Sequence, residues 1–201
     1  MQFDQDERGF SFSKEGPLDM RMDPTAKMTA KEVVNTLPEK DLGEMFKELG
    51  EEKLWRVSAK AIVNARRKKP IQTTTELSQI LEEVIPRGGR KIHPATKIFQ
   101  AIRIYVNREL ETLQETIEKA VNFLRPGGQV AVITFHSLED RIVKNVFRDL
   151  SSPIRNHYGQ KISEAKLETI TKKPIMPTFK ETRNNRRARS AKFRVARKRV
   201  E

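Results

Sequence analysis

Cysteine is absent from the 201-residue sequence, and histidine occurs only three times, as His93, His136 and His157. Without cysteine the chain can form neither disulfide bonds nor metal sites with thiolate ligands. The three histidines are far apart in the sequence and show no spacing typical of metal ligands. The sequence therefore predicts that the protein has no metal site.

Long apolar runs are also missing from the sequence. No stretch approaches the roughly 20 apolar residues that a membrane-spanning helix needs. The opening segment Met1–Arg8 lacks the basic and apolar regions of a signal peptide. We therefore expect a soluble, cytoplasmic protein with no membrane partner.

Acidic residues are too few to balance the basic ones. The chain has 40 Lys and Arg against 27 Asp and Glu, which gives a formal net charge of +13 and an isoelectric point near 10.1. A charge of this sign and size favours a polyanionic partner, most simply nucleic acid. No helix-turn-helix, zinc-finger or aromatic RNA-binding signature is present to specify the kind of nucleic acid.

The basic charge is concentrated at the end of the sequence. From Lys180 to Glu201 there are ten Lys and Arg and two Glu, so this segment carries +8 of the total +13. Two interpretations are open: a solubilising tail, or a nucleic-acid contact that is partly docked in a sheet. Ala191, Phe193 and Val195 alternate with basic residues as in a half-exposed edge strand, which favours the second interpretation.

Between Thr29 and about Pro86 the sequence shows helical signals throughout and no strand pattern. Thr29 with Glu32 and Thr73 with Glu76 match the capping box, in which side chains satisfy free amide groups at a helix start. Four helices fit this span, and their ends are marked by Pro38, Gly50, Pro70 and Pro86. A helical block between a loop and later α/β material predicts an inserted domain.

A helix, a strand and a second helix follow the helical block. Apolar residues spaced by three or four predict one long helix over residues 94–124. Pro126–Gly128 then forms a turn, and the apolar run Val130–Phe135 predicts a strand that is covered on both faces. The next helix, over residues 138–150, is capped by Ser137. This unit is typical of half of a doubly wound α/β domain.

Less regular sequence follows this unit. Residues 151–173 are polar, and their pattern predicts one short helix around residues 163–170. Pro174 and Pro177 bound a segment that the two prolines keep extended and outside any central strand.

The carboxyl end of the predicted strand carries Phe135, His136 and Ser137. Chemistry in open α/β sheets is found at such strand ends, because the loops there line a crevice. The alternative interpretation is a strand followed by a capped helix, in which these residues have no chemical role. On this tripeptide alone, both interpretations stay open.

Residues 1–24 form a loop punctuated by glycine and proline, yet they hold unusual groups. Arg8–Phe12 sets two aromatic residues beside a cation, and Gly16–Asp23 alternates apolar and charged residues. One interpretation is a surface loop whose Phe and Met side chains tuck into the core. The other is a substrate loop that stacks a base.

Taken together, these segments resemble the 16S ribosomal RNA cytosine-N4 methyltransferases of the MraW/RsmH type. Several separate motifs occur in the order typical of that family, and they extend over nearly the whole chain. The segments that carry the resemblance are Arg8–Phe12, Gly16–Asp23, Gly50–Glu52, His93–Thr96, Phe99–Arg103, Asn107 with Glu109–Leu110, Pro126–Lys144 and Arg187–Ala191.

The resemblance implies an α/β fold: a partial Rossmann-like class I methyltransferase domain with an inserted all-helical domain. Residues 1–24 would be a loop of the methyltransferase domain, residues 25–93 the inserted domain, and residues 94–201 the C-terminal part with a basic terminal strand. The implied activity is S-adenosylmethionine-dependent methylation of the N4 amino group of a cytidine. That cytidine lies in the decoding region of small-subunit ribosomal RNA, so the implied partner is this RNA or the ribosomal subunit.

One departure from the family pattern concerns the cofactor. The family's glycine-rich cofactor loop, ribose-binding acid and first strands precede the point that Met1 matches. Of the family's contacts to S-adenosylmethionine, only the glutamine that matches Gln2 has a counterpart here. We therefore expect a truncated enzyme, and the sheet edge left by the cut can pair with a second copy in a homodimer. The alternative is a non-catalytic RNA-binding or ribosome-assembly protein.

The implied reaction requires a cytosine amine to face a methyl group in line with its leaving group. The amine is a poor nucleophile, so a stacked aromatic ring and acceptors for its two hydrogens would help it to attack. We assign stacking or acceptor roles at the catalytic site to Phe10, Phe12, Asp19, Asp23, Phe135, His136 and Ser137. The target base has to leave its stack, and we assign contacts with the flanking RNA backbone to Arg103, Arg141, Arg187, Arg189 and Arg194.

Overall fold

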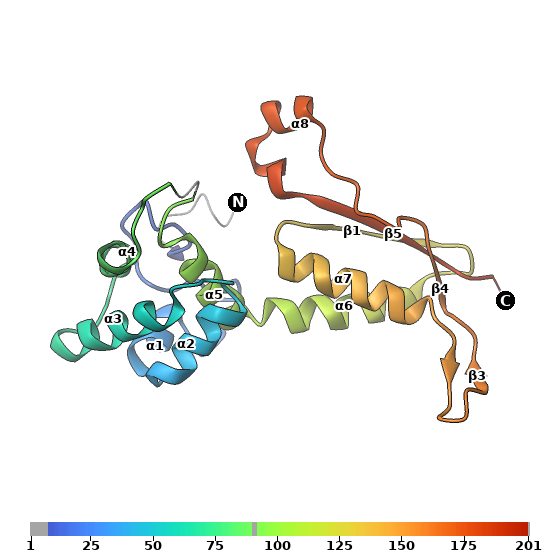
Figure 1. The fold of residues 1–201 in the computed structure, drawn as a ribbon, viewed down its shortest axis with the longest axis horizontal. Coiled ribbons are helices and arrows are strands. Elements are labelled where there is room, and N and C mark those ends of the chain that lie inside the picture. Colours follow the sequence, from blue (N-terminus) through green and yellow to red (C-terminus); the bar gives the residue numbers. More distant parts are fainter. Residues whose placement is uncertain (1–7, 90–91, 201) are drawn as a thin grey trace. The chain divides into compact units, whose positions relative to one another are not determined.

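The computed structural model describes residues 8–89 and 92–200 (Figure 1). Within these residues the protein is a mixed α/β molecule that divides into two compact units between Glu109 and Leu110. Residues 8–109 form the helical unit, and residues 110–200 form the sheet unit.

Within its described residues, the helical unit is built from five helices. Thr29 and Thr73 cap the first and the fourth, and each forms the complete capping box predicted with Glu32 and Glu76. The four helices predicted before Pro86 are therefore confirmed, and a fifth follows. Their bounds are α1 Ala30–Thr36, α2 Glu39–Glu48, α3 Trp55–Lys68, α4 Thr74–Val84 and α5 Thr96–Asn107.

One apolar core fills the helical unit. Phe46 of α2, Ile62 of α3 and Ile98 of α5 are all fully buried in it. Burial of a side chain of this size stabilises the fold by about 1.5–3 kcal/mol. The loop before α1 adds Leu18 and Met20, which are also completely buried. The core therefore extends beyond the helices into this loop.

Backbone contacts tie the loop to two helices. The amide of Leu18 donates to the carbonyl oxygen of Gln72 ahead of α4, and the amide of Lys31 in α1 donates to the Leu18 carbonyl oxygen. Gly9 has a φ of +70°, and a Cβ atom there would collide with the carbonyl oxygen of Pro17. Glycine is therefore required where these two parts of the loop approach each other.

The single long helix predicted over residues 94–124 is wrong, because the chain interrupts it at Arg108. This residue is left-handed, with φ 48° and ψ 43°, so α5 ends at Asn107 and α6 (Glu109–Phe123) begins anew. The side chain of Asn107 donates to the carbonyl oxygen of Met20 at 2.8 Å. The spacing of apolar residues continues through the break, so periodicity alone cannot reveal it.

The sheet unit contains a three-stranded antiparallel sheet. β5 (Lys192–Lys198) lies between β1 (Gln129–Thr134) and β4 (Leu167–Thr169), and Ile175 adds a single bridge to β5. The edge strand predicted around Ala191–Val195 is therefore wrong, because this basic strand is the centre of the sheet. Its second neighbour comes from a polar segment that shows no strand pattern.

Helices α6 and α7 (Ser137–Leu150) cover one face of this sheet (Figure 1). Val130 and Val132 of β1 pack against the apolar cluster on that face. The cluster consists of Ile117, Val121, Val143, Val146, Phe147, Leu167 and Ala196. On the opposite face, Ile133 is 57% exposed. The predicted coverage of this strand on both faces is therefore wrong for the residues that the structure describes.

The segment between α7 and β5 differs from the prediction in one place and agrees in another. In place of the helix expected at residues 163–170, the chain forms β3 (Lys161–Ser163), which pairs with β2 (Ile154–Arg155), and then β4. The extended segment between Pro174 and Pro177 is confirmed by the bridge at Ile175. The helix α8 (Phe179–Asn184) and the 3-10 helix η3 (Arg186–Ser190) come before β5. Across the described part of the chain, no helix is long and apolar enough to cross a membrane.

Candidate functional site

The loop ahead of α1 buries part of its predicted binding surface. Phe10 is 8% exposed and Met20 is 1% exposed, and both belong to the core of the helical unit. The guanidinium carbon of Arg8 lies 5.8 Å from the centre of the Phe10 ring. The interpretation in which Phe and Met side chains tuck into the core is confirmed for Phe10 and Met20.

Phe12 is half-buried and already has aromatic partners. Its ring stacks on His93, with the ring centres 4.5 Å apart and an angle of 16° between the planes. It meets Phe99 of α5 edge-on, with 5.6 Å between the ring centres. A base that stacks on Phe12 would have to use the other face of the ring or displace His93.

Asp19 is held by Arg21. Its Oδ1 accepts from Nε of Arg21 and its Oδ2 accepts from Nη2, each at 2.8 Å. The hydrogen bonds from Arg21 lower the pKa of Asp19, although burial of the carboxyl group acts in the opposite direction. The carboxylate is therefore ionised at neutral pH, and both of its oxygens already accept hydrogen bonds.

Asp23 is more accessible than Asp19. Its Oδ1 accepts from the amide of Thr25 at 2.8 Å and from the hydroxyl at 2.7 Å, and these hydrogen bonds lower the pKa of Asp23. The residue is exposed. The loop therefore presents an ionised carboxylate at its surface. Its Oδ1 accepts the hydrogen bonds from Thr25, and Oδ2 is the other oxygen of the group.

Two side chains fix the backbone between these aspartates. Nη2 of Arg8 donates to the carbonyl oxygens of Arg21 and Met22, each at 2.9 Å. Asn107 accepts from the amide of Met22 at 2.6 Å and donates to the carbonyl oxygen of Met20 at 2.8 Å. Met20 has a φ of 60°, which is uncommon for a residue with a side chain. In the sequence, Asn107 stands out only as part of a family motif, and no local pattern reveals its contact with this distant loop.

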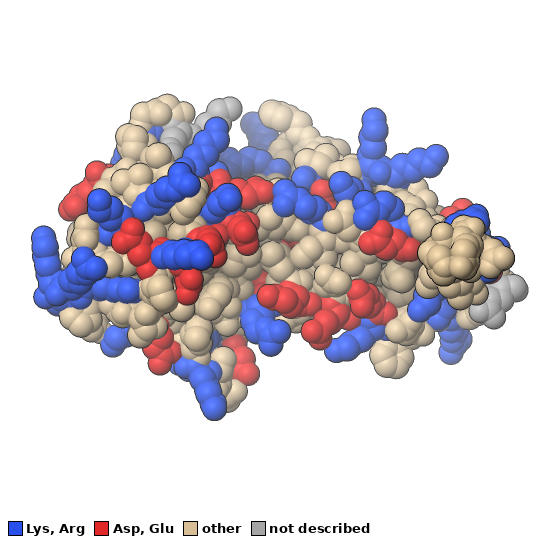
Figure 2. Space-filling view, turned by 60° about the horizontal axis from the view of Figure 1, so that its bottom comes forward, with Lys and Arg blue, Asp and Glu red and all other residues tan. Residues whose placement is uncertain are grey.

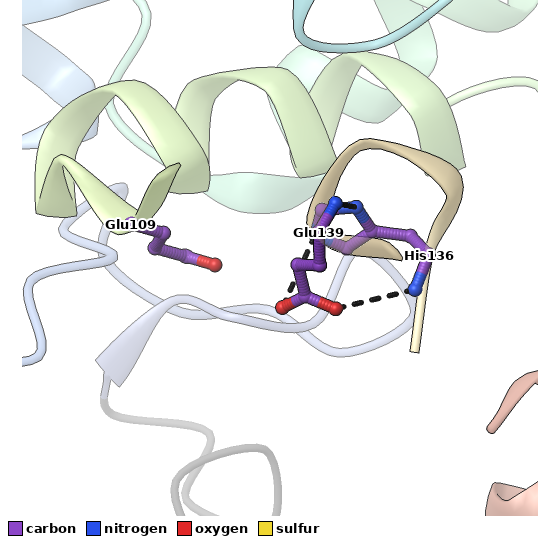
Figure 3. Close-up of side chains that lie close together, drawn as sticks. All are labelled: Glu109, His136 and Glu139. Carbon is purple, nitrogen blue, oxygen red and sulfur yellow. Dashed lines mark hydrogen bonds and ion pairs between the residues drawn. The ribbon is translucent and has the colours of Figure 1, made fainter. Parts of the chain in front are cut away.

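In the sheet unit, His136 is the N-cap of α7 (Figure 3). Its Nδ1 accepts from the amide of Glu139 at 3.3 Å, and the Glu139 carboxylate accepts from the amides of Phe135 and His136 at 2.7 and 3.2 Å. Because an amide can only donate, Nδ1 carries no proton, and Nε2 lies 3.4 Å from Oε1 of Glu139. The predicted cap at Ser137 is wrong by one residue, since the preferred capping types favoured serine over histidine.

The two neighbours of His136 are accessible. Phe135 is 53% exposed, and Ser137 is exposed as well. Alternation along the strand direction places Phe135 on the same face as the exposed Ile133. The end of β1 therefore presents an aromatic ring and a hydroxyl group, while the imidazole of His136 is used in the helix cap.

A buried ion network joins α7 to the central strand. Nε and Nη2 of Arg194 donate to the two carboxylate oxygens of Asp140 at 2.7 and 3.2 Å, and Arg194 is only 6% exposed. Nζ of Lys192 lies 3.3 Å from the same carboxylate. The hydrogen bonds from Arg194 lower the pKa of Asp140 against the effect of burial, with help from Lys192. Arg194 would have to leave Asp140 to bind a phosphate.

The other arginines predicted to bind RNA differ in how exposed their side chains are. Arg103 donates to both carboxylate oxygens of Glu109, at 2.7 and 2.9 Å. Arg141 of α7 is exposed, as are Arg187 and Arg189 on η3. On the face drawn in Figure 2, basic side chains are interspersed with acidic ones. Binding of a polyanion to this face would therefore depend on local groups of cations.

The predicted site residues fall in both units. Phe10, Phe12, Asp19, Asp23 and Arg103 belong to the helical unit, while Phe135, His136, Ser137, Arg141, Arg187, Arg189 and Arg194 belong to the sheet unit. Gln2 lies outside the described residues. Within the sheet unit, the first turn of α7 contacts two of them separately: Glu139 accepts from the amide of His136, and Asp140 accepts from Arg194.

Comparison with known proteins gives matches along the chain. The model of the MraW methylase family matches residues 1–199. A relative from Protochlamydia amoebophila, named ribosomal RNA small subunit methyltransferase H, is 52% identical over 205 residues, which cover 98% of this chain and 64% of the relative. Relatives of the same name from Caldicellulosiruptor bescii and Persephonella marina are 48% and 52% identical over 202 and 195 residues. These matches cover 98% and 96% of this chain.

The chain spans 62% to 66% of the length of these three relatives. The family match extends through both units, so it does not depend on a single motif. The chain therefore belongs to the MraW methylase family.

Proposed function

We propose that this chain is part of an S-adenosylmethionine-dependent enzyme of the cytoplasm that methylates N4 of a cytidine. The proposed target lies in the decoding region of small-subunit ribosomal RNA. The observation that carries the proposal is the family match over residues 1–199, together with relatives named ribosomal RNA small subunit methyltransferase H. The role proposed for the described residues is to hold the RNA and the target base.

The proposed architecture is a Rossmann-like methyltransferase domain with an inserted helical domain. Residues 25–93 would be the insertion, and residues 1–24 and 94–201 would belong to the methyltransferase domain. The capping boxes of α1 and α4 support this proposal, because both helix starts that they fix lie within residues 25–93. The apolar core also includes Leu18 and Ile98, which lie outside the proposed insertion.

The described residues do not fit a site for S-adenosylmethionine. Binding of a nucleotide-like cofactor at a strand end needs a glycine-rich turn after the strand, where the backbone can approach the ligand. Here Gly127 and Gly128 precede β1, and the capping box of His136 and Glu139 follows it. We therefore derive no step through the cofactor, and Gln2 is the single contact proposed for it.

The target amine needs an aromatic surface and hydrogen-bond acceptors. Of the three proposed aromatic residues, Phe135 has the most accessible ring, since Phe10 is buried and one face of Phe12 is covered. Asp23 has an exposed carboxylate, whereas both oxygens of Asp19 accept from an arginine. We assign base stacking to Phe135 and an acceptor role to Asp23. Asp19 then acts as a positioning residue for the loop.

The residues next to Phe135 receive different roles. Ser137 is exposed, so its hydroxyl group is the proposed second acceptor for the amine. The ring of His136 caps α7 through Nδ1. We therefore assign His136 a positioning role, in which it fixes the direction of the backbone on either side of it.

Exposed arginines are proposed to hold the RNA backbone. Arg187 and Arg189 lie on η3, and Arg141 lies on α7. Each phosphate contact is expected to add about 0.7–0.9 to the slope of log affinity against log salt. Arg103 and Arg194 are paired with carboxylates, and their proposed part is to hold the elements that carry the exposed cations.

Methyl transfer can be tested on a chimera. The chimera joins this chain to the third of the Protochlamydia relative that it does not match, and the chain alone is assayed beside it. The substrate is unmodified small-subunit ribosomal RNA with labelled S-adenosylmethionine, and the product nucleoside is identified by mass spectrometry. We expect N4-methylcytidine from the chimera and a lower single-turnover rate after Asp23→Asn or Phe135→Ala. Methylation of another atom, or no methylation while the relative itself is active, would reject the proposal.

A second candidate function is non-catalytic RNA binding or ribosome assembly. The observation that favours it is the lack of fit between the described residues and the cofactor. Titration of the 201-residue chain and of the chimera with S-adenosylmethionine separates the two candidates. Saturable binding to either protein supports an enzyme, whereas RNA binding with no cofactor binding by either protein supports an assembly role.

A homodimer is also part of the proposal. Among the described strands, β1 pairs only with β5, so the other edge of β1 can accept a strand from a second copy. Sedimentation over a range of concentrations tests this pairing. A constant monomer mass would reject it without affecting the proposed reaction.

A further inference from the structure

The segment around α3 carries charge of one sign. Residues 53–75 contain seven Lys and Arg and no Asp or Glu. Five of these cations lie in α3 itself, whereas the 15 residues of α6 hold four Glu and one Lys. A basic segment of this length creates a positive potential that attracts polyanions.

The cations of α3 form a stripe on its exposed side. Arg56, Lys60 and Arg67 are all exposed, while Ile62 and Val63 of the same helix are buried. At 3.6 residues per turn, the three cations lie within about 40° of one another around the helix axis, and they span about 17 Å along it. A stripe of this length can contact several phosphates along one strand.

The stripe is not neutralised by neighbouring acids. Within the described part of the chain, no carboxylate forms an ion pair with Lys60, Arg67 or Lys68. Arg66 differs from them, because its guanidinium donates to two backbone carbonyl oxygens, those of Val34 at 2.7 Å and Leu37 at 2.6 Å. Burial lowers the pKa of Arg66, and the like charge of Arg67 acts in the same direction. Arg66 therefore anchors α3, and the exposed cations are left for a ligand.

An aromatic residue lies at the first turn of this stripe. The guanidinium carbon of Arg56 is 4.3 Å from the centre of the Trp55 ring, and Nζ of Lys47 is 6.0 Å from it. The ring packs so closely on α2 that a Cβ atom at Gly43 would lie 2.9 Å from it. A hollow of about 420 Å³ adjoins the ring and is lined by Glu39, Lys40, Trp55, Arg56 and Ala59. Glu39 is the single acid in this lining.

We propose that the exposed face of α3, from Arg56 to Arg67, binds the phosphodiester backbone of RNA. The proposal rests on the proposed function, which makes RNA the relevant polyanion. It adds an RNA contact in the helical unit to the one proposed on η3. Arg56 is preorganised by Trp55, so it loses less conformational freedom on binding than a free arginine would.

The test uses the complete 201-residue chain and a short labelled RNA hairpin. In the triple variant Arg56→Gln/Lys60→Gln/Arg67→Gln, we expect weaker binding and a salt slope that is smaller by about 2 to 3 units. A matched control, Lys27→Gln/Lys31→Gln/Lys119→Gln, removes the same charge from exposed positions elsewhere. The control variant is expected to keep most of the wild-type slope of log affinity against log salt. Equal slopes for the two triple variants would overturn the proposal.

Trp55 provides a second readout, because it is the only tryptophan in the chain. Binding at α3 should change its fluorescence at the same RNA concentrations that saturate the labelled hairpin. The change should persist in Arg187→Gln/Arg189→Gln, which alters η3 alone. RNA binding without a change in fluorescence would place the RNA elsewhere and reject the proposal.

The outcomes also separate this proposal from the proposed function. If the α3 variant binds RNA like the wild type while the chimera methylates cytidine, the inference fails and the function stands. If α3 binds RNA but the chimera transfers no methyl group, the function fails and the inference stands. Wild-type protein that binds no RNA would reject the α3 contact outright.

Discussion

The helical unit and the sheet unit differ in how much apolar surface they bury. In the helical unit, one cluster of 22 buried residues joins the helices to the preceding loop, whereas the corresponding cluster of the sheet unit has seven. The sheet unit also exposes large apolar side chains, with Phe179 84% and Ile133 57% exposed. Apolar burial therefore accounts for more of the stability of the helical unit, because its contribution grows with the area removed from water.

Polar contacts contribute a larger part of the stability of the sheet unit. The pair of Asp140 and Arg194 joins α7 to β5 beside a small apolar cluster. In the helical unit, the side chain of Asn107 holds a loop whose Leu18 and Met20 are themselves part of the apolar core. We therefore expect the two units to respond differently to apolar and to polar substitutions.

The largest expected difference in the free energy of unfolding is between two phenylalanine substitutions, one in each unit. Phe46 is completely buried in the helical unit, so Phe46→Ala should lower the free energy of unfolding by about 3–5 kcal/mol. Phe179→Ala in the sheet unit should change it by less than about 0.5 kcal/mol. Denaturant unfolding followed by circular dichroism measures both values. Similar losses for the two variants would mean that the exposed face of the sheet unit is covered in solution.

The next loss of stability is expected when the buried ion pair of the sheet unit is broken. Asp140→Asn leaves the guanidinium of Arg194 buried without its carboxylate, and such a loss costs about 3–5 kcal/mol at neutral pH. The control Asp149→Asn removes an exposed carboxylate that pairs with Arg148, so its expected cost is below about 1 kcal/mol. Hydrogen exchange of amides in α7 and β5 locates the loss in the sheet unit.

The ion pair of Asp140 and Arg194 predicts that the stability of the sheet unit depends on pH. Arg194 lowers the pKa of Asp140 in the folded protein below its ordinary value of 3.8. The stabilisation is therefore complete above the unfolded pKa and is lost as the pH falls through the lower, folded pKa. The stability difference between wild type and Asp140→Asn should shrink below about pH 4. A difference that stays constant from pH 7 to acid would contradict this pairing.

The sequence reveals much of the helical unit and less of the sheet unit. Capping boxes at Thr29 and Thr73 are local signals, so the helix starts that they predict are correct. The neighbours of β5 come from distant parts of the chain, and one of them lies in a polar segment. Strand pairing of this kind depends on contacts that no window of sequence contains.

The candidate site shows the same limit. The motifs identify the loop up to Asp23 and the end of β1 as unusual segments, and the structure gives them ordered geometry. The sequence does not distinguish an exposed arginine from a buried one, such as Arg187 from Arg194. Arg194 is buried at the point where β5 faces α7, and there Asp140 pairs with its guanidinium.

An intermediate effect is expected at the loop of the helical unit. Asn107→Ala removes the acceptor for the Met22 amide and the donor to the Met20 carbonyl oxygen, which should cost about 1–3 kcal/mol. The apolar contacts among the helices do not involve Asn107, so opening should be confined to the loop. Faster hydrogen exchange at Met22 with unchanged exchange in α2 would agree with this expectation, and Asn122→Ala serves as an exposed control. Loss of the entire helical unit would show that the loop is an integral part of its core.

The smallest expected loss of stability comes from removing one helix cap in each unit. Thr73→Ala and His136→Ala each remove a side-chain acceptor from a capping box, so each should cost about 1 kcal/mol. Asn is a good capping residue, and His136→Asn should therefore restore most of the stability lost in His136→Ala. In the chimera, a positioning role for His136 predicts that Asn restores the single-turnover rate as well. If Asn restores stability but not the rate, the imidazole itself takes part in the reaction, and the assignment of His136 as a positioning residue is wrong.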